Sequence, residues 1–249
     1  PLIDGLIAEP AFLITKSELK LKLNIKDETL RILHLSDLHF GTSNPLLYST
    51  VKNVVKDLRP DVIVITGDII SKETALSDAI EFIEDLEKIA PTFIVWGNWD
   101  HWSLGNRILR FRESLESIGE VRVLVNESFV LENGVSFVGV DDPYTGRDSL
   151  NLALKNSSNT RILLAHSPQI IDKAVNNVDL VLAGHTHGGQ VVLPIIGPIF
   201  TPLPARYRKY VSGLFKIGNT VMYVSRGLGT SILPIRFSCP PEILLVEIL

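Results

Sequence analysis

The feature that most constrains this chain is a series of short apolar runs, rich in Val, Ile and Leu, that recur along most of its length. Runs of this length and composition are typical of strands that are buried on both faces, as in a sheet covered by helices. We therefore expect strands at 31–36, 61–66, 92–96, 135–140, 161–165, 178–183, 221–225 and 242–248.

Between several of these runs, apolar residues repeat at helical spacing. The first such segment begins at Asn44 and Pro45, a favourable cap followed by proline at the first helical position, and it ends at Pro60. Two further segments cover 76–86 and 108–118. Strand and helix thus alternate in the N-terminal half, which predicts an α/β fold with parallel strands.

The rest of the chain adds a hairpin and a β-rich end, with no sign of a division into domains. The triplet 132–134, Glu-Asn-Gly, predicts a hairpin turn. No linker rich in Ser, Gly or Pro interrupts the 249 residues, so we predict a single domain over 1–249. The one cysteine, Cys239, excludes a disulfide framework and a Cys-rich zinc module. No apolar stretch reaches the roughly 18 residues of a membrane-spanning helix.

Polar residues gather where the predicted strands end. Five of the six histidines lie at or just beyond the carboxyl end of an apolar run. Ligands bind at this edge of open α/β sheets, so we expect these side chains to converge there. The polar runs are Ser36-Asp37-Leu38-His39, Gly67-Asp68, Gly97-Asn98-Trp99-Asp100-His101, Ala165-His166-Ser167-Pro168 and Gly184-His185-Thr186-His187-Gly188-Gly189.

The spacing and chemistry of these residues indicate bound metal. Asp37 and His39 are two residues apart, so in extended backbone their side chains point the same way, and the same holds for His185 and His187. Carboxylate, amide and imidazole ligands without thiolate suit Mn, Fe, Zn or Mg. Seven candidates are too many for one such ion, which favours two ions that share a bridging carboxylate. The candidates are Asp37, His39, Asp68, Asn98, His166, His185 and His187.

Taken together and in this order, the blocks resemble the signature of the calcineurin-like metallophosphoesterase superfamily. The matching strings are Asp37-x-His39, Gly67-Asp68, Gly97-Asn98, His166 and Gly184-His185-x-His187. Further strings resemble a bacterial phosphodiesterase-like branch whose members often carry a membrane anchor upstream. These are Leu6–Pro10, Gly188-Gly189-Gln190, Ser225-Arg226-Gly227 and Pro234-Ile235-Arg236. The expected location is the cytoplasm or a membrane surface. The chain begins at Pro1 without methionine, which leaves two alternatives open, with and without an anchor upstream.

The resemblance implies a fold and a mechanism. The fold is a four-layer α/β/β/α sandwich, in which two mixed sheets are flanked by helices. One ion is held by Asp37, His39 and His187, the other by Asn98, His166 and His185, and Asp68 bridges them. The implied reaction is hydrolysis of a phosphate ester by a metal-bridging hydroxide, since two cations lower the pKa of water.

One position departs from the family pattern. The family usually has histidine after Gly-Asn, where it helps to protonate the leaving oxygen, but this chain has Trp99, and indole is no acid at useful pH. Our hypothesis is that His101, two residues on, takes the role of catalytic acid or phosphate-binding group; a second-sphere role is the alternative. Arg226 and Arg236 are candidates for binding substrate phosphate, with ion pairing inside the fold as the alternative.

The segment 191–204 has four prolines and a glycine among apolar residues, and three basic residues follow at 206, 208 and 209. An apolar and then basic order can contact a membrane surface or a lipid-bearing substrate. The four prolines forbid a regular amphipathic helix, which favours the alternative that the segment is a buried cap over a sheet edge.

The leading function is therefore two-metal hydrolysis of a phosphodiester or similar small phosphate ester. Hydrolysis of a lipid-linked nucleotide pyrophosphate is one alternative. A metal-binding scaffold with impaired catalysis, with Trp99 as the lesion, is another. A nuclease is disfavoured, and no nucleic-acid partner is expected, because the net charge is −4 and no basic stripe is present.

Overall fold

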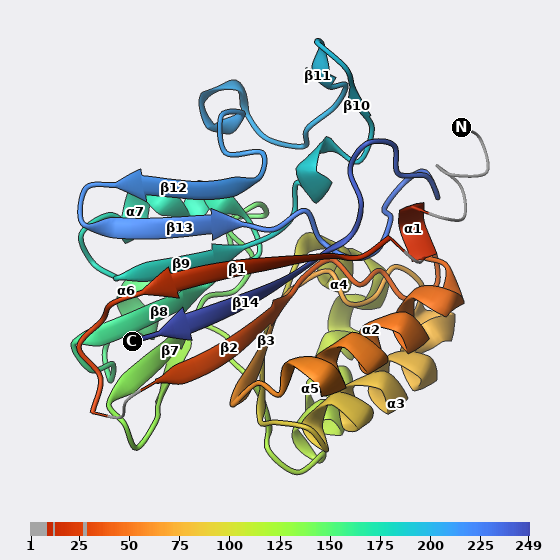
Figure 1. The fold of residues 1–249 in the computed structure, drawn as a ribbon. Coiled ribbons are helices and arrows are strands. Elements are labelled where there is room, and N and C mark those ends of the chain that lie inside the picture. Colours follow the sequence, from red (N-terminus) through yellow and green to blue (C-terminus); the bar gives the residue numbers. More distant parts are fainter. Residues whose placement is uncertain (1–8, 12, 27–28) are drawn as a thin grey trace.

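A computed structural model of the chain describes residues 9–11, 13–26 and 29–249. Two six-stranded sheets form its centre (Figure 1). The first has the order β1 (Thr15–Leu21), β14 (Glu242–Ile248), β2 (Leu30–Leu35), β3 (Val62–Thr66), β4 (Thr92–Val95) and β5 (Val121–Val123). The second has the order β12 (Gly213–Ile217), β13 (Thr220–Val224), β9 (Leu180–Ala183), β8 (Thr160–Leu164), β7 (Val135–Gly139) and β6 (Glu127–Val130).

Both sheets are mixed, as expected. The strands β2 to β5 run parallel, whereas β14 is antiparallel to β2. In the second sheet β7, β8, β9 and β13 are parallel, and β6 and β12 are antiparallel to their neighbours. The predicted hairpin turn at 132–134 joins β6 to β7. All eight expected strands are present, with ends that differ by no more than two residues.

Helices cover the outer face of each sheet and complete the four layers (Figure 1). The first sheet is covered by α2 (Pro45–Leu58), α3 (Leu76–Glu87) and α5 (Ile108–Glu116), which are the three predicted helices. Asn44 caps α2 by accepting from the Leu46 N–H. Buried side chains such as Leu47 and Ile83 pack on Leu33 of the sheet. The second sheet is covered by α6 (Leu150–Ala153) and α7 (Ile171–Ala174).

A separate apolar layer fills the space between the two sheets. Ile32, Val64 and Phe93 of the first sheet meet Phe137 and Ile162 of the second, and all five are buried. The rings of Phe93 and Phe137 stack with their centroids 4.8 Å apart. Both faces of the central strands are therefore covered, which explains their continuous apolar runs.

Two edge strands, β1 and β12, were not expected from the sequence. In β1 exposed and half-buried residues alternate, and in β12 the pattern is similar. Such strands lack the apolar run by which a central strand is recognised. Within the described residues, β1 pairs with β14 alone. The loop before β14 supports the turn after β2. Leu228 N–H donates to the Ser36 carbonyl at 2.9 Å and Gly229 N–H to the Asp37 carbonyl at 2.6 Å.

The segment 191–204 forms a hairpin of β10 (Val192–Leu193) and β11 (Gly197–Pro198) that projects from the second sheet's end of the molecule (Figure 1). The expectation that it is a buried cap is wrong, because Ile195, Ile196, Ile199 and Phe200 are exposed. Apolar composition alone does not show whether a segment packs against a sheet edge or lies exposed to solvent. Among the residues that the structure describes, none of the helices combines the length and apolar character needed to cross a membrane.

Candidate metal centre

The seven candidate ligands lie together at the carboxyl ends of five parallel strands. Asp37 and His39 follow β2, Asp68 follows β3, and Asn98 follows β4 at the start of α4 (Asn98–Leu104). His166 follows β8, and the pair His185 and His187 follows β9, so both sheets contribute. All seven side chains are buried.

The local backbone at these positions is not extended, which corrects our account of the paired spacing. Asp37 and His39 have φ of 54° and 52°, and His185 and His187 have φ of 72° and 51°. Asp68 also has a positive φ, of 52°. Left-handed backbone is unfavourable in residues with a Cβ and is concentrated at functional sites. Tight turns, rather than the alternation of a strand, direct these side chains inward.

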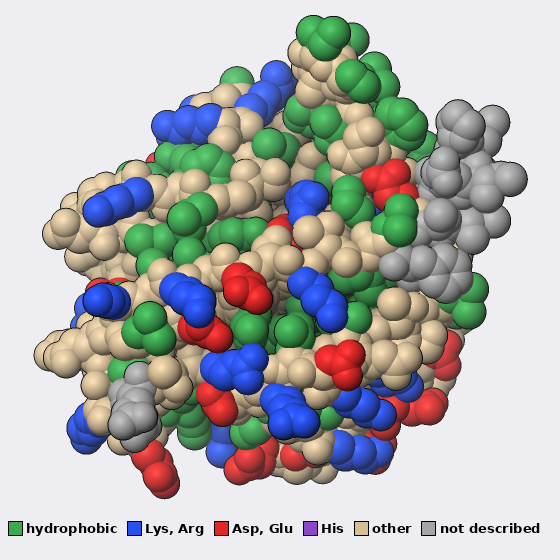
Figure 2. Space-filling model, in the orientation of Figure 1, with side chains coloured by type: hydrophobic (Ala, Val, Ile, Leu, Met, Phe, Trp, Pro, Cys, Tyr) green, Lys and Arg blue, Asp and Glu red, His purple; other side chains and the backbone are tan. Residues whose placement is uncertain are grey.

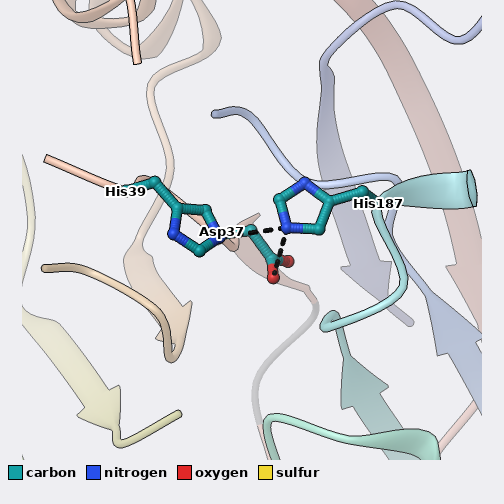
Figure 3. Close-up of side chains that lie close together, drawn as sticks. All are labelled: Asp37, His39 and His187. Atoms are coloured by element: carbon teal, nitrogen blue, oxygen red, sulfur yellow. Dashed lines mark hydrogen bonds and ion pairs between the residues drawn. The ribbon is translucent and has the colours of Figure 1, made fainter. Parts of the chain in front are cut away.

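The first group of ligands consists of Asp37, His39 and His187, shown in Figure 3. The Nε2 atoms of His39 and His187 are 3.0 Å apart, and His187 Nε2 is 3.5 Å from Oδ1 of Asp37. One ligand atom of each residue lies within 4.8 Å of the others. Such a set is compact enough to surround one ion.

The second group consists of Asp68, His166 and His185, with Asn98 beside it. His166 Nε2 lies 3.0 Å from His185 Nδ1 and 3.1 Å from Asn98 Oδ1. Asp68 connects the two groups: its Oδ2 is 3.3 Å from His166 Nε2 and 3.5 Å from His39 Nε2. Asp68 therefore has the position that a bridging carboxylate requires.

The hydrogen bonds of His166 show that this site fits a cation. Its Nδ1 lies 2.9 Å from the Thr66 carbonyl oxygen, which can only accept, so Nδ1 carries the proton. Nε2 of His166 faces two further acceptors, Oδ1 of Asn98 and Oδ2 of Asp68, and can meet them either by carrying a second proton or by binding a cation through its lone pair. Acceptors that face one another in a buried site need a positive charge between them.

The electrostatics of the site agree with this arrangement. Burial lowers the pKa of His39 to about 4 and that of His185 to about 3, so both imidazoles are neutral near pH 7 and can act as ligands. For His166, the negative charge of Asp68 outweighs burial and raises the pKa to about 10. The point between His166 and Asp68 therefore attracts positive charge.

Asp100 is a supporting residue that our reading of the sequence missed. Its carboxylate is fully buried and accepts from the N–H groups of Ile69, Ile70 and Gly97, at 2.8, 2.9 and 2.9 Å. It thus joins the turn after β3 to the turn after β4, and these turns carry Asp68 and Asn98. An acidic residue three positions after the helix cap Gly97 was the available signal.

Trp99 and His101 point to different sides of α4. Trp99 lines the cavity over the metal centre, and its ring lies edge-on to His39 with centroids 5.9 Å apart. His101 is absent from that cavity's lining, and its Nε2 lies 2.6 Å from Oδ1 of Asp141. Positions two apart on a helix are about 200° apart around its axis, so the side chains of Trp99 and His101 leave α4 on different sides. The structure does not bring His101 to the ligands.

Neither Arg226 nor Arg236 lines the cavity, although Nη2 of Arg236 lies 3.4 Å from Nδ1 of the candidate ligand His187. Arg236 is fully buried and donates to the carbonyl oxygens of Arg226, Gly227, Gly229 and Cys239. Arg226 forms an ion pair with Glu242, at 3.4 Å. Both arginines thus interact with groups inside the fold, which was the alternative to binding substrate phosphate.

Comparisons with known proteins agree with the geometry. A family model described as calcineurin-like phosphoesterase matches residues 30–189, which is more than half of the chain. The chain is 34% identical to the metallophosphoesterase YkuE of Bacillus subtilis over 86% of this chain and 77% of that protein. It is 32% identical to the phosphodiesterase YaeI of Escherichia coli over 88% of this chain and 82% of that protein.

One solved structure shows the same fold. The crystal structure of TT1561 of Thermus thermophilus superposes with a TM-score of 0.50 at 16% identity, covering 80% of this chain and 90% of that one.

Proposed function

The chain belongs to the calcineurin-like phosphoesterase family, and from this premise we propose that it hydrolyses a phosphodiester or related phosphate ester with two divalent metal ions. The relative named a phosphodiesterase supports the diester as substrate. Mn, Fe, Zn and Mg all suit the imidazole, carboxylate and amide ligands.

A single observation carries the proposal. Oδ2 of Asp68 lies within 3.5 Å of an imidazole nitrogen from each ligand group. Its other oxygen, Oδ1, accepts from the Trp99 N–H at 2.8 Å, which fixes the carboxylate plane. Two sites that share one carboxylate oxygen are the arrangement for a pair of ions about 3.5–4 Å apart.

Such an ion pair supplies a nucleophilic hydroxide near neutral pH and neutralises charge on the phosphoryl oxygens. The chain holds and orients the pair. The Thr66 carbonyl fixes the tautomer of His166, and the Ser71 hydroxyl, 2.7 Å from Nδ1 of His39, orients that ring. Asp37, Asp68 and Asn98 would provide the oxygen ligands, and the indole of Trp99 lines the cavity over them.

Residue 99 is tryptophan, so no imidazole at this position can donate a proton to the leaving oxygen. As the structure places it, His101 binds Asp141 and so orders the segment that carries Tyr144 into the cavity. A direct acid role for His101, which the sequence suggested, requires its ring to leave Asp141. We therefore propose that His101 is a positioning residue.

The test combines metal content with turnover. Purified protein is loaded with Mn²⁺ or Zn²⁺, and bound metal and hydrolysis of bis(4-nitrophenyl) phosphate are measured for the wild type, Asp68→Asn and the control Asp85→Asn. Asp85 pairs with Lys52 and Lys88 on the surface, so its variant should keep both properties. Asp68→Asn should lose metal and turnover. Two bound ions with no turnover on any ester would instead favour the scaffold.

A further inference from the structure

The cavity over the metal centre has a volume of about 610 Å³ and continues into an apolar surface. Its floor includes Asp68, Asn98, His185 and His187. Of the fifteen large apolar side chains that are exposed in the described part of the chain, six line this cavity, and two more lie at the tip of the adjoining hairpin. The six are Trp102, Tyr144, Ile199, Phe200, Ile232 and Leu233; the two are Ile195 and Ile196.

We call Ile195, Ile196, Ile199, Phe200, Ile232 and Leu233 the apolar rim. Phe200 is 65% exposed, Ile196 74% and Ile232 75%. Figure 2 shows apolar side chains at the projecting tip of the hairpin, with no acidic side chain among them. Exposed apolar groups on this scale mark a site of contact with a partner, a ligand or a membrane.

Two polar side chains of the cavity walls, those of Thr186 and Gln190, are already engaged. Thr186 Oγ1 donates to the Val211 carbonyl oxygen at 2.6 Å. The Gln190 amide donates to the Leu233 carbonyl oxygen at 2.7 Å and accepts from the Ser231 N–H at 3.2 Å. A nucleoside or sugar is selected by directional donors and acceptors. Most of the residues around the mouth of this cavity are instead apolar, among them Val191, Ile199, Phe200, Ile232, Leu233 and Ile235. Hydrocarbon needs no donors or acceptors, so the cavity favours an apolar group.

Basic residues lie next to the apolar rim. The segment between the hairpin and β12 is anchored by the buried side chains of Leu203, Tyr207 and Tyr210. It leaves Arg206, Arg208 and Lys209 exposed. Figure 2 shows Lys and Arg side chains on the same end of the molecule as the hairpin. Arg206 pairs with Asp172, and the charge of Arg208 and Lys209 is complementary to an anionic lipid surface.

We propose that the substrate is a phosphodiester with a long hydrocarbon chain, which the enzyme takes from a lipid bilayer against which the apolar rim lies. This inference rests on the proposed function, because the metal centre would hold the phosphoryl group while the chain lies in the cavity. Water adds to phosphorus, one P–O ester bond breaks, and the leaving oxygen takes a proton, which gives a phosphomonoester and an alcohol.

The substrate class is tested with a series of alkyl 4-nitrophenyl phosphates whose alkyl chain grows from one carbon to eight. The leaving group stays the same, so only chain binding changes. Burial of each CH₂ contributes about 0.8 kcal/mol, so kcat/KM should rise at least tenfold. No dependence on chain length would overturn the inference. No metal-dependent turnover on any member would overturn the proposed function instead.

The lipid source is tested by co-sedimentation of the metal-loaded protein with vesicles of phosphatidylcholine and phosphatidylglycerol. The wild type should sediment with them. The double variant Ile195→Ser/Ile196→Ser should lose most of this binding, with circular dichroism as the check that it folds. Leu109→Ser, an exposed leucine on α5, is the matched control and should bind as the wild type does. Equal binding by all three proteins, or by none, would overturn the membrane contact.

Discussion

The backbone N–H of Trp99 donates a 2.8 Å hydrogen bond to Oδ1 of Asp68. The side chain of residue 99 takes no part in this bond, although it lines the cavity. Support of the Asp68 carboxylate and lining of the cavity are thus separated within one residue. A change in the side chain can alter chemistry in the cavity without disturbing the ligands.

This separation leads to a prediction for Trp99→His. The variant should bind the same number of metal ions as the wild type, because the N–H that supports Asp68 remains. It should hydrolyse esters with poor leaving groups several-fold faster, because an imidazole near the leaving oxygen can donate a proton. Metal analysis and turnover of methyl phosphodiesters measure both effects. Loss of metal would show that the indole itself supports the centre.

His101→Ala should reduce turnover by a similar factor for activated and unactivated leaving groups, since His101 contacts Asp141 rather than the cavity. His101→Gln keeps a donor near the position of Nε2, toward Asp141, and should restore much of the rate. Steady-state kinetics of a nitrophenyl and an alkyl diester provide the comparison. A much larger loss with the alkyl ester would establish His101 as the acid.

Gly97→Ala should weaken metal binding. A Cβ at residue 97 would lie 2.5 Å from the Asp68 nitrogen and 2.9 Å from Cε1 of His166, closer than packing allows. Overpacking of this kind typically costs about 1–3 kcal/mol. Gly105→Ala is the control for metal binding only: nothing lies within 4 Å of its Cβ, but its φ of 50° makes an alanine there strained. Gly105→Ala should therefore lose stability and keep its metal affinity. Metal titration would contradict the prediction if the two variants bound metal equally well.

Stability should depend on pH through His34. Burial lowers the pKa of His34 to about 4, below its ordinary value of 6.5, and Nδ1 has no hydrogen-bond partner. The unfolded chain therefore binds more protons between these values, so stability falls as the pH drops from 6.5 toward 4. At pH 5 the loss from this group is about 2 kcal/mol.

The matched variant is His34→Gln, which can still donate to Thr66, as Nε2 of His34 does at 2.7 Å. Its free energy of unfolding should decline less between pH 7.5 and pH 5, as measured by urea denaturation. Parallel declines in the two proteins would exclude His34 as a source of the pH dependence.

The ligand set could be predicted from the sequence because each ligand follows an apolar run that forms a central strand. Burial on both faces makes such a strand visible, and the carboxyl ends of parallel strands meet at one edge. The edge strands β1 and β12 could not be predicted in the same way, since each buries only part of its side chains.

The sequence did not reveal features that depend on where a side chain or a segment points in the folded protein. His101 was expected near the ligands, but α4 turns its side chain toward Asp141. The apolar hairpin was expected to be covered, yet Ile195 and Ile196 are exposed. The sequence does not distinguish Asp100 from the polar residues around it, because its three backbone N–H donors come together only in the folded protein.

The position of β14 in the first sheet determines when that sheet can form during synthesis of the chain. β14 lies between β1 and β2, so β1 has no partner in its sheet until β14, more than 200 residues further along the chain, has been synthesised. The 228–229 loop, which holds the turn at Asp37, is also synthesised long after that turn. The candidate ligands can therefore take their final arrangement only after the ribosome has completed β14.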